Sequence, residues 1–142
     1  MNTMNPVIHF EMPAEDQKRM SGFYTQAFGW KMQHMGPEMG NYVLVHTTEI
    51  DEKTQTPKKP GAINGGFFQK TKPNQHPSVV ISVDDIHEAM NKIKDAGGKI
   101  LGGQKPGEPD NIPDVGLYVS FLDTEGNRVG ILQPAPMADQ KK

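Results

Sequence analysis

Two side chains that could do chemistry lie close together near the start of the chain. His9 and Glu11 are separated by one residue in the segment V7-I8-H9-F10-E11-M12, where apolar and mixed positions alternate. This alternation is typical of a strand and places the imidazole and the carboxylate on the same face. Glu11 could then act as a general base, or it could form an ion pair or be an exposed carboxylate at the sheet edge.

Other histidines could extend this pair. His46 could join His9 and Glu11 in a set of two histidines and one carboxylate, an arrangement that holds divalent metals. His76 lies two residues before Ser78 and would face the same side of a longer strand, although a solvated loop position is the alternative. Without such partners, His9 is expected either to be a hydrogen-bonded interior residue or to line a cavity.

Further side chains could line a ligand site. The amide of Asn64 offers both an oxygen and a nitrogen to a ligand. The following pair, Gly65-Gly66, would either allow a close approach of a ligand or form a β-bulge. Three aromatic side chains could stack on a ligand or belong to the core, namely Trp30, Tyr42 and Phe68.

The first half of the chain is expected to form one strand, one helix and three further strands. The helix begins near Glu15 and Asp16, where acidic groups favour a helix N-terminus, and it ends at Gly29. Strands are expected at 30–34, 42–46 and 62–68. Residues 47–60 show neither the alternation of a strand nor the spacing of a helix, so they are expected to be an exposed loop. The helix should bury an apolar stripe formed by Met20, Phe23, Tyr24, Ala27 and Phe28.

The second half shows the same order of elements. A strand at 78–83 precedes a helix with Asp84 as its expected N-cap, and the helix stops at Gly97-Gly98. Strands follow at 99–104, 116–122 and 128–133, with a loop at 106–114 and a polar tail after 134. The apolar side of this helix comprises Ile86, Ala89, Met90 and Ile93.

The two halves match as an internal repeat. Aligning His9 with Ser78 places Gly29 on Gly98 without a gap from the start of the strand to the end of the helix. Low identity with a shared pattern is typical of a duplicated structural unit. We therefore predict a single domain over 1–142, with modules at about 6–69 and 77–134 and a tail at 135–142.

Composition excludes several classes of protein. A chain of 142 residues is long enough for one domain with a core, and its net charge of −2 argues against nucleic-acid binding. The absence of cysteine excludes disulfides and thiolate chemistry. No apolar run approaches the roughly 20 residues that span a bilayer. The N-terminus does not resemble a signal peptide, so a cytoplasmic protein is expected.

Several segments together resemble a known superfamily. The opening strand, the segment F28-G29-W30, the run V80-I81-S82-V83-D84-D85-I86 and the turn F121-L122-D123-T124-E125-G126-N127 occur in the order found in glyoxalase-like proteins. The chain is similar to the vicinal-oxygen-chelate superfamily of glyoxalases, extradiol dioxygenases and bleomycin-resistance proteins. The resemblance implies an α+β fold in which two tandem βαβββ modules form a curved mixed sheet around a cavity.

The same resemblance implies four positions for ligands of a divalent metal, two in each module. The first falls on His9, the corresponding one in the second module on Ser78, and the last on Gly130. The remaining position falls within 62–66, where only Asn64 could contribute an oxygen. A stable site generally needs three or more good protein ligands, so no metal cofactor is expected, and a divalent metal is the alternative.

The main functional hypothesis is a metal-independent protein that holds a small organic molecule in the cavity, as bleomycin-resistance proteins do. Its ligand contacts would come from His9, Glu11, Trp30, Tyr42, Asn64, Phe68 and Ser78. The first alternative is a divalent-metal-dependent lyase, isomerase or dioxygenase that uses His9, with His46 or His76 as partners. The second is a non-catalytic protein-interaction domain. Many relatives pair, so a homodimer is expected by analogy.

Overall fold

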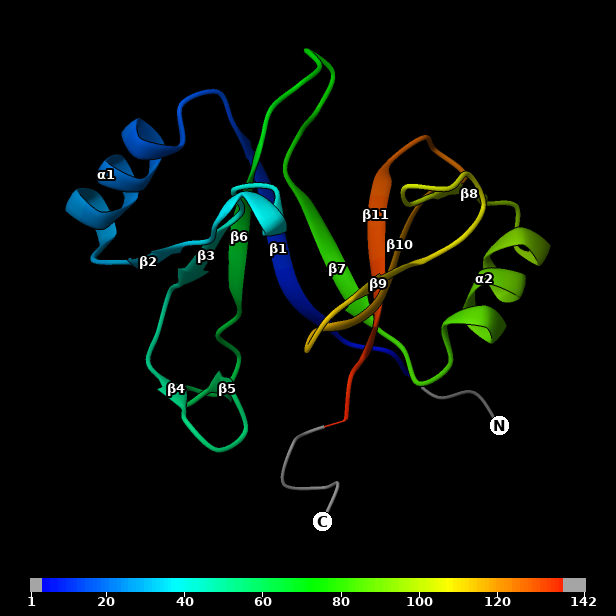
Figure 1. The fold of residues 1–142 in the computed structure, drawn as a ribbon. Helices are drawn as coiled ribbons and strands as arrows, with labels where there is room; N and C mark the ends of the chain where they lie inside the picture. Colours follow the sequence, from blue (N-terminus) through cyan, green and yellow to red (C-terminus); the bar gives the residue numbers. More distant parts are fainter. Residues whose placement is uncertain (1–3, 137–142) are drawn as a thin grey trace. The chain divides into compact units, whose positions relative to one another are not determined.

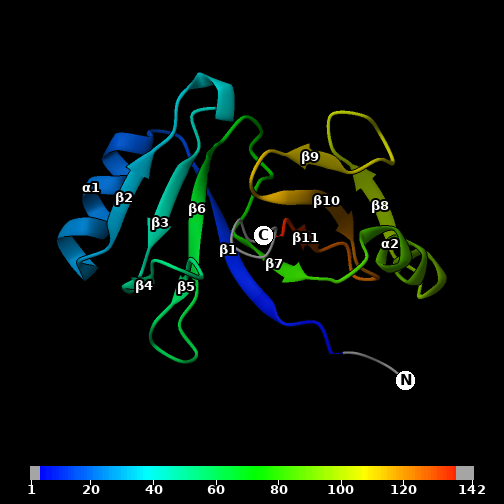
Figure 2. The same ribbon diagram turned by 60° about the horizontal axis from the view of Figure 1, so that its bottom comes forward.

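A computed structural model of the chain describes residues 4–136, so residues 137–142 of the expected tail lie outside the described part. Its backbone contacts group the chain into two compact units. One unit comprises His9–Ser78 and the other comprises the described residues of Met1–Ile8 and Val79–Lys142. We call them the first and the second module, and a strand that crosses a boundary is described with the module that holds most of its residues. Figures 1 and 2 show these elements in two views.

The first module contains a mixed sheet of four main strands in the order β2-β3-β6-β1 (Figure 1). Strands β1 and β6 run parallel, whereas β6 pairs antiparallel with β3, and β3 with β2. One helix, α1, lies against this sheet. The bounds of these elements are β1 Val7–Ala14, α1 Gln17–Phe28, β2 Lys31–His34, β3 Val43–His46 and β6 Asn64–Gln69.

Helix α1 begins and ends where the sequence predicts. The Asp16 carboxylate accepts a hydrogen bond from the Arg19 backbone N–H at 2.9 Å and so caps the N-terminus. Gly29 adopts a left-handed conformation with φ 75° and closes the C-terminus. The predicted apolar stripe is wrong in part, because Phe23 and Phe28 are 58% and 64% exposed. The helix instead turns the face that carries Ser21 inward.

The core of the first module lies between α1 and the sheet. Val43, Val45 and Phe67 are fully buried, and they alternate along β3 and β6 with residues that face the other way. Met12 and Trp30 pack against this cluster from β1 and from the residue before β2. Burial of one face only leaves the opposite face of the sheet free to carry polar side chains.

The segment 47–60, predicted to be an exposed loop, is mostly exposed but is not without regular structure. It contains a small hairpin of β4 (Ile50–Asp51) and β5 (Thr56–Pro57). The Asp51 carboxylate accepts hydrogen bonds from the backbone N–H groups of Lys53 and Thr54, at 2.9 and 3.2 Å. Strands of two residues are too short to produce a visible hydrophobic period, so the sequence pattern could not reveal them.

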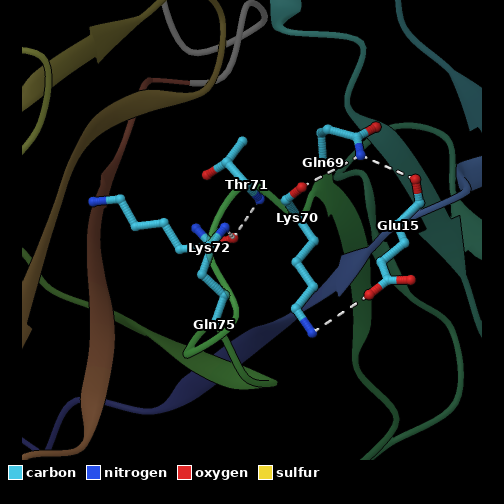
Figure 3. Close-up of polar contacts among 6 residues, drawn as sticks. All are labelled: Glu15, Gln69, Lys70, Thr71, Lys72 and Gln75. Carbon is cyan, nitrogen blue, oxygen red and sulfur yellow. Dashed lines mark hydrogen bonds and ion pairs between the residues drawn. The ribbon is translucent and has the colours of Figure 1, made fainter.

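The segment that follows β6 is tied back to the end of β1 (Figure 3). Gln69 donates a hydrogen bond from Nε2 to the Glu15 carbonyl at 3.0 Å, and Lys70 Nζ lies 3.9 Å from the Glu15 carboxylate. The Gln75 side-chain oxygen then accepts from the backbone N–H groups of Thr71 and Lys72. These contacts give the predicted linker, 70–77, a defined turn.

The second module repeats the plan with β7, α2, β8, β10 and β11, and its sheet order is β7-β11-β10-β8. Strand β9 pairs with β10 and lies inside the segment 106–114, which was predicted to be a loop. Asp85 caps α2, so the prediction of Asp84 is wrong by one residue. The bounds are β7 Ser78–Ser82, α2 Ile86–Asp95, β8 Lys99–Gly102, β9 Asp110–Ile112, β10 Gly116–Leu122 and β11 Arg128–Pro134.

The apolar side of α2 packs as the sequence predicts. Ile86 is fully buried and Met90 is 5% exposed, and both contact a cluster that includes Val119 and Ile131. Ala89 and Ile93 pack against the same cluster. Within residues 4–136 no helix is long and apolar enough to cross a membrane.

Strand register confirms that the two modules are equivalent. In the parallel pair β1–β6 Glu11 lies opposite Gly66, and in the parallel pair β7–β11 Val80 lies opposite Gly130. Aligning His9 with Ser78 also aligns Glu11 with Val80, so the structure and the sequence repeat agree. The predicted α+β fold of two βαβββ modules is therefore confirmed, with the short strands as additions.

Candidate functional site

The candidate site lies on the face of the first module's sheet that points away from the α1 core. His9 and Glu11 are half-buried, as the alternation in the opening strand predicts. In the register of β1 and β6, His9 lies opposite Asn64, and Glu11 lies opposite Gly66. The sheet therefore places an imidazole, a carboxylate and a carboxamide within one small area.

Tyr42 joins the two titratable side chains of this site. Its hydroxyl lies 3.1 Å from His9 Nε2 and donates a hydrogen bond to Glu11 Oε2 at 3.0 Å. Tyr42 sits just before β3, and its carbonyl accepts a hydrogen bond from the Met35 backbone N–H at 2.8 Å. The phenol thus bridges groups that the sheet alone would only place side by side.

The Tyr42 ring is accommodated because Gly66 has no side chain. A Cβ atom built on Gly66 would overlap the Tyr42 hydroxyl and ring atoms. Gly66 is buried, and it faces both Glu11 in β1 and Leu44 in β3. The close approach predicted for the glycine pair 65–66 is thus made at Gly66 by a side chain of the same protein.

Burial controls the charge state of His9. Loss of hydration lowers the pKa of the His9 imidazole, and the Glu11 carboxylate opposes this with a smaller raising effect. The neutral imidazole is therefore the form that the site favours near neutral pH. A neutral imidazole has one donor nitrogen and one acceptor nitrogen, so its tautomer decides what it can bind.

We expect His9 to titrate below 6.5, its ordinary pKa. The unfolded chain then binds this proton more readily than the folded protein does. The contribution of His9 to stability is complete above 6.5 and is lost as the pH falls from there through the folded pKa. An NMR titration of the ring resonances measures this, with a peptide of residues 5–13 as the unfolded reference. In Glu11→Gln the pKa should fall further, and a rise would contradict the assignment.

Asn64 is partly committed to the fold. Its side-chain oxygen accepts a hydrogen bond from the Thr47 backbone N–H at 2.8 Å, and Thr47 Oγ1 lies 3.3 Å from the same oxygen. Thr47 Oγ1 also donates to the Ile63 carbonyl at 2.6 Å. The Asn64 oxygen thus closes the end of the β3–β6 pairing, and the amide nitrogen is the group that can turn to a ligand.

The other predicted contacts fall in different places. Trp30 stacks on Tyr24 with ring centroids 4.7 Å apart, within the core on the helix side. Phe68 is half-buried and lies opposite Pro13, on the same side of β6 as Gly66. Ser78 Oγ is buried and makes no hydrogen bond to a described residue. Phe68 therefore shares the face of the candidate site, whereas Trp30 does not.

The remaining histidines are not brought into a cluster with His9. His46 lies opposite Lys31 in the β2–β3 register and lines a groove of about 610 Å³ with residues of the β4–β5 hairpin. His76 is exposed in the linker. Over the described range, 4–136, no three histidine, aspartate or glutamate side chains are grouped so that they could hold a metal ion. The set of His9, Glu11 and His46 is therefore not assembled.

The residues present do not fit the metal that the resemblance implies. The position expected within 62–66, with Asn64 as its candidate, falls on Gly66, because the strand register makes Gly66 the equivalent of Gly130. Two of the four positions are then glycines, and a third is Ser78, a neutral hydroxyl. At the fourth, His9 Nε2 already contacts the Tyr42 hydroxyl. Such a set lacks the three good protein ligands that a stable site needs.

Sequence reasoning did not identify the function of Tyr42 in this network, or single out Tyr118. Tyr42 was predicted only as a ligand contact. In the second module the Tyr118 ring lies over Gly130, where a built Cβ would come within 2.6 Å of the hydroxyl. The signal in the sequence is a Tyr-Val pair in each module, at 42–43 and 118–119, but its meaning depends on the strand register.

The two βαβββ modules, with a histidine on the first strand, place the chain in the class of glyoxalase-like proteins. The sequence profile of the Glyoxalase/Bleomycin resistance protein/Dioxygenase superfamily matches residues 7–131, and the chain belongs to this superfamily. A "Glyoxylase-like domain-containing protein" from Didymella fabae is 34% identical over 124 residues, which cover 82% of this chain and 84% of that protein.

Solved structures share the fold at low sequence identity. A hypothetical protein from Bacillus halodurans matches with a TM-score of 0.66 and 12% identity, covering 96% of this chain and 99% of the other. A methylmalonyl-CoA epimerase from Streptomyces coelicolor, in complex with 2-nitronate-propionyl-CoA, matches with a TM-score of 0.66 and 14% identity, covering 95% and 98%. The epimerase from Mycobacterium tuberculosis gives 0.65 and 13%, covering 96% and 94%. These matches concern the fold alone.

Proposed function

We propose that the protein binds a small organic molecule on the His9 face of the first module without a catalytic metal. The observation that supports this most directly is the Tyr42 hydroxyl, which lies 3.1 Å from His9 Nε2 and 3.0 Å from Glu11 Oε2. The Tyr42 hydroxyl thus engages the His9 nitrogen and the Glu11 oxygen in one hydrogen-bonded network. Membership of a superfamily that includes bleomycin-resistance proteins is consistent with this function.

The chemistry of the face suits a small molecule with both polar and apolar parts. His9, Tyr42, Glu11 and the Asn64 amide supply hydrogen-bond donors and acceptors. Phe68 adds an apolar surface on the same side of β6. Small-molecule sites typically combine apolar walls with a few well-placed polar groups, which fix the orientation of the ligand. Trp30 is not part of this proposal because it packs in the helix-side core.

The alternatives lead to different measurements. A divalent-metal lyase, isomerase or dioxygenase that uses His9 would bind a metal ion stoichiometrically. A non-catalytic protein-interaction domain would bind neither a metal nor a small molecule. The proposed ligand-binding protein would gain thermal stability from a small molecule, because a ligand that binds only the folded state stabilises it. A homodimer remains a prediction from the behaviour of relatives.

The decisive experiment combines calorimetry with thermal shift. Metal-stripped protein is titrated with Ni²⁺, Zn²⁺, Mn²⁺ and Fe²⁺, and the same protein is screened against a library of small aromatic and polar compounds. We expect no stoichiometric metal binding. At a ligand concentration of 100 times Kd, we expect stabilisation of about 2.7 kcal/mol. The stabilisation should disappear in His9→Ala and persist in His87→Ala, a matched change of an exposed histidine on α2. One metal ion per chain that is lost in His9→Ala would refute the proposal.

A further inference from the structure

The two modules share an arrangement of one tyrosine and one glycine. In the β3–β6 pair Gly66 lies opposite Leu44, and in the β10–β11 pair Gly130 lies opposite Ser120. The tyrosine stands two residues before that partner in each case, at Tyr42 and Tyr118. Because the same geometry occurs in both halves, the arrangement of tyrosine beside glycine is a feature of the βαβββ module.

Each tyrosine occupies the volume into which a side chain on the opposite glycine would extend. A Cβ atom on Gly66 would overlap the Tyr42 hydroxyl, and one on Gly130 would approach the Tyr118 hydroxyl to 2.6 Å. A tyrosine in this position and a ligating side chain at the glycine therefore exclude each other. The resemblance expects a metal ligand at Gly130, and Gly66 is the equivalent position of the first module by strand register.

Hydrogen-bond accounting also fixes the proton on His9. The Tyr42 hydroxyl has one hydrogen, and it donates this hydrogen to the Glu11 carboxylate, which can only accept. The contact of 3.1 Å between the same hydroxyl and His9 Nε2 is then satisfied by the tautomer in which the imidazole Nε2–H is the donor. Nε2 carries the proton, and Nδ1 of the neutral ring carries the lone pair.

We propose that Tyr42 takes the place of a metal ion in the first module: its hydroxyl holds His9 at Nε2, and its ring fills the space over Gly66. Tyr42 is thus a positioning residue that acts through His9. It leaves Nδ1 as a hydrogen-bond acceptor, which favours small organic ligands that present an O–H or N–H group. This inference rests on the proposed metal-free binding function and identifies the residue responsible for it.

The first test is the state of His9 in solution. Long-range ¹⁵N–¹H correlation spectra of the metal-free protein at neutral pH show which imidazole nitrogen is protonated. We expect the proton on Nε2, with slow exchange against water because Tyr42 accepts it. Tyr42→Phe should speed that exchange on the order of tenfold, since a hydrogen bond of about 1.4 kcal/mol is lost. Tyr24→Phe, a matched loss of a hydroxyl in the same module, should not. A proton on Nδ1 in the unmodified protein would overturn the proposal.

The second test rebuilds the metal site. In the double variant Tyr42→Ala with Gly66→Glu, the new carboxylate would stand beside Glu11 and near His9, which gives three candidate ligands. We expect this variant to bind Ni²⁺ or Zn²⁺ near one ion per chain. The affinity should be at least about tenfold higher than in the matched variant Tyr42→Ala with Gly66→Gln, which lacks the charge. Circular dichroism checks that both variants are folded.

The outcomes separate this inference from the proposed function. If the unmodified protein binds no metal and the folded glutamate variant also binds none, the inference fails while the metal-free function stands. If the unmodified protein binds a metal through His9, the proposed function itself fails. Metal binding by the glutamate variant alone supports both. Equal binding by the glutamate and glutamine variants would also overturn the inference, because the ion would then bind elsewhere.

Discussion

Replacing Phe67 with alanine is expected to lower the free energy of unfolding by about 3–5 kcal/mol, the usual cost of removing a buried aromatic ring. Phe67 is 0% exposed, and its ring centroid lies 5.7 Å from that of Tyr24 on α1. It pairs with Val43 on one side and Met12 on the other, so its side chain holds the helix against three strands. Denaturant unfolding followed by circular dichroism measures the change.

The adjacent residue provides the matched control. Phe68 has the same side chain in the same strand, but it points to the opposite face and is only half-buried. Phe68→Ala should therefore cost clearly less than Phe67→Ala, because fewer packed neighbours are lost and a smaller cavity forms. If the two variants lost the same stability, the assignment of the core to the helix side of the sheet would be wrong.

Gly116→Ala is expected to have the second large effect, in the second module. Gly116 is buried at the start of β10 with φ 137°, a conformation that residues with a side chain rarely adopt. Backbone strain of this kind costs about 1–3 kcal/mol. A Cβ atom there would also overlap the Gln133 carbonyl oxygen of the paired strand, and overpacking adds about 1–3 kcal/mol. We expect a correspondingly lower midpoint in denaturant.

A second glycine separates the two causes of this loss. Gly107 also has a positive φ, of 78°, but a Cβ atom built on it meets no atom within 4 Å. Gly107→Ala should therefore lower the free energy of unfolding only by the strain of a left-handed backbone conformation, about 1–2 kcal/mol. The difference between the two variants contains the clash with β11 together with any extra backbone strain at φ 137° over φ 78°. Equal losses would show that conformation alone matters at Gly116.

The elements of the fold could be predicted because their signals are local. An aspartate before each helix, a glycine after it, and a change from period two to period 3.6 are visible in the sequence, and the structure has α1 and α2 at those places. The strands 42–46, 62–68 and 116–122 were placed within two residues of the observed ones. The order of strands came from the resemblance, since local patterns do not determine pairing.

The errors arose where tertiary contacts overrode local patterns. The aromatic residues Phe23 and Phe28 follow a helical period, but α1 turns Ser21 inward and leaves both rings largely exposed. The hairpin within 47–60 is fixed by the Asp51 side chain and by two short paired strands, not by hydrophobic alternation. Contacts of this kind depend on a few specific hydrogen bonds.

The candidate site was predictable in part, because the position of two of its residues follows from a local pattern. Alternation in the first strand placed His9 and Glu11 on one face, and the structure has them there. The contact of Tyr42 with both requires the register of β3 against β6 and the absence of a side chain on Gly66. The glycine is visible in the sequence, but the register that places it beside Tyr42 is not, because a shift by one residue reverses every side chain.

The position of Trp30 makes the first module optically distinguishable. It is the single tryptophan of the chain, and its indole is stacked on the Tyr24 ring at an interplanar angle of 9°. Fluorescence excited at the indole band therefore reports the environment of the first module, whereas circular dichroism averages over both. Coincident curves from the two methods would show that the modules melt as one cooperative unit. An earlier change in fluorescence would show that the module carrying His9 and Tyr42 loosens first.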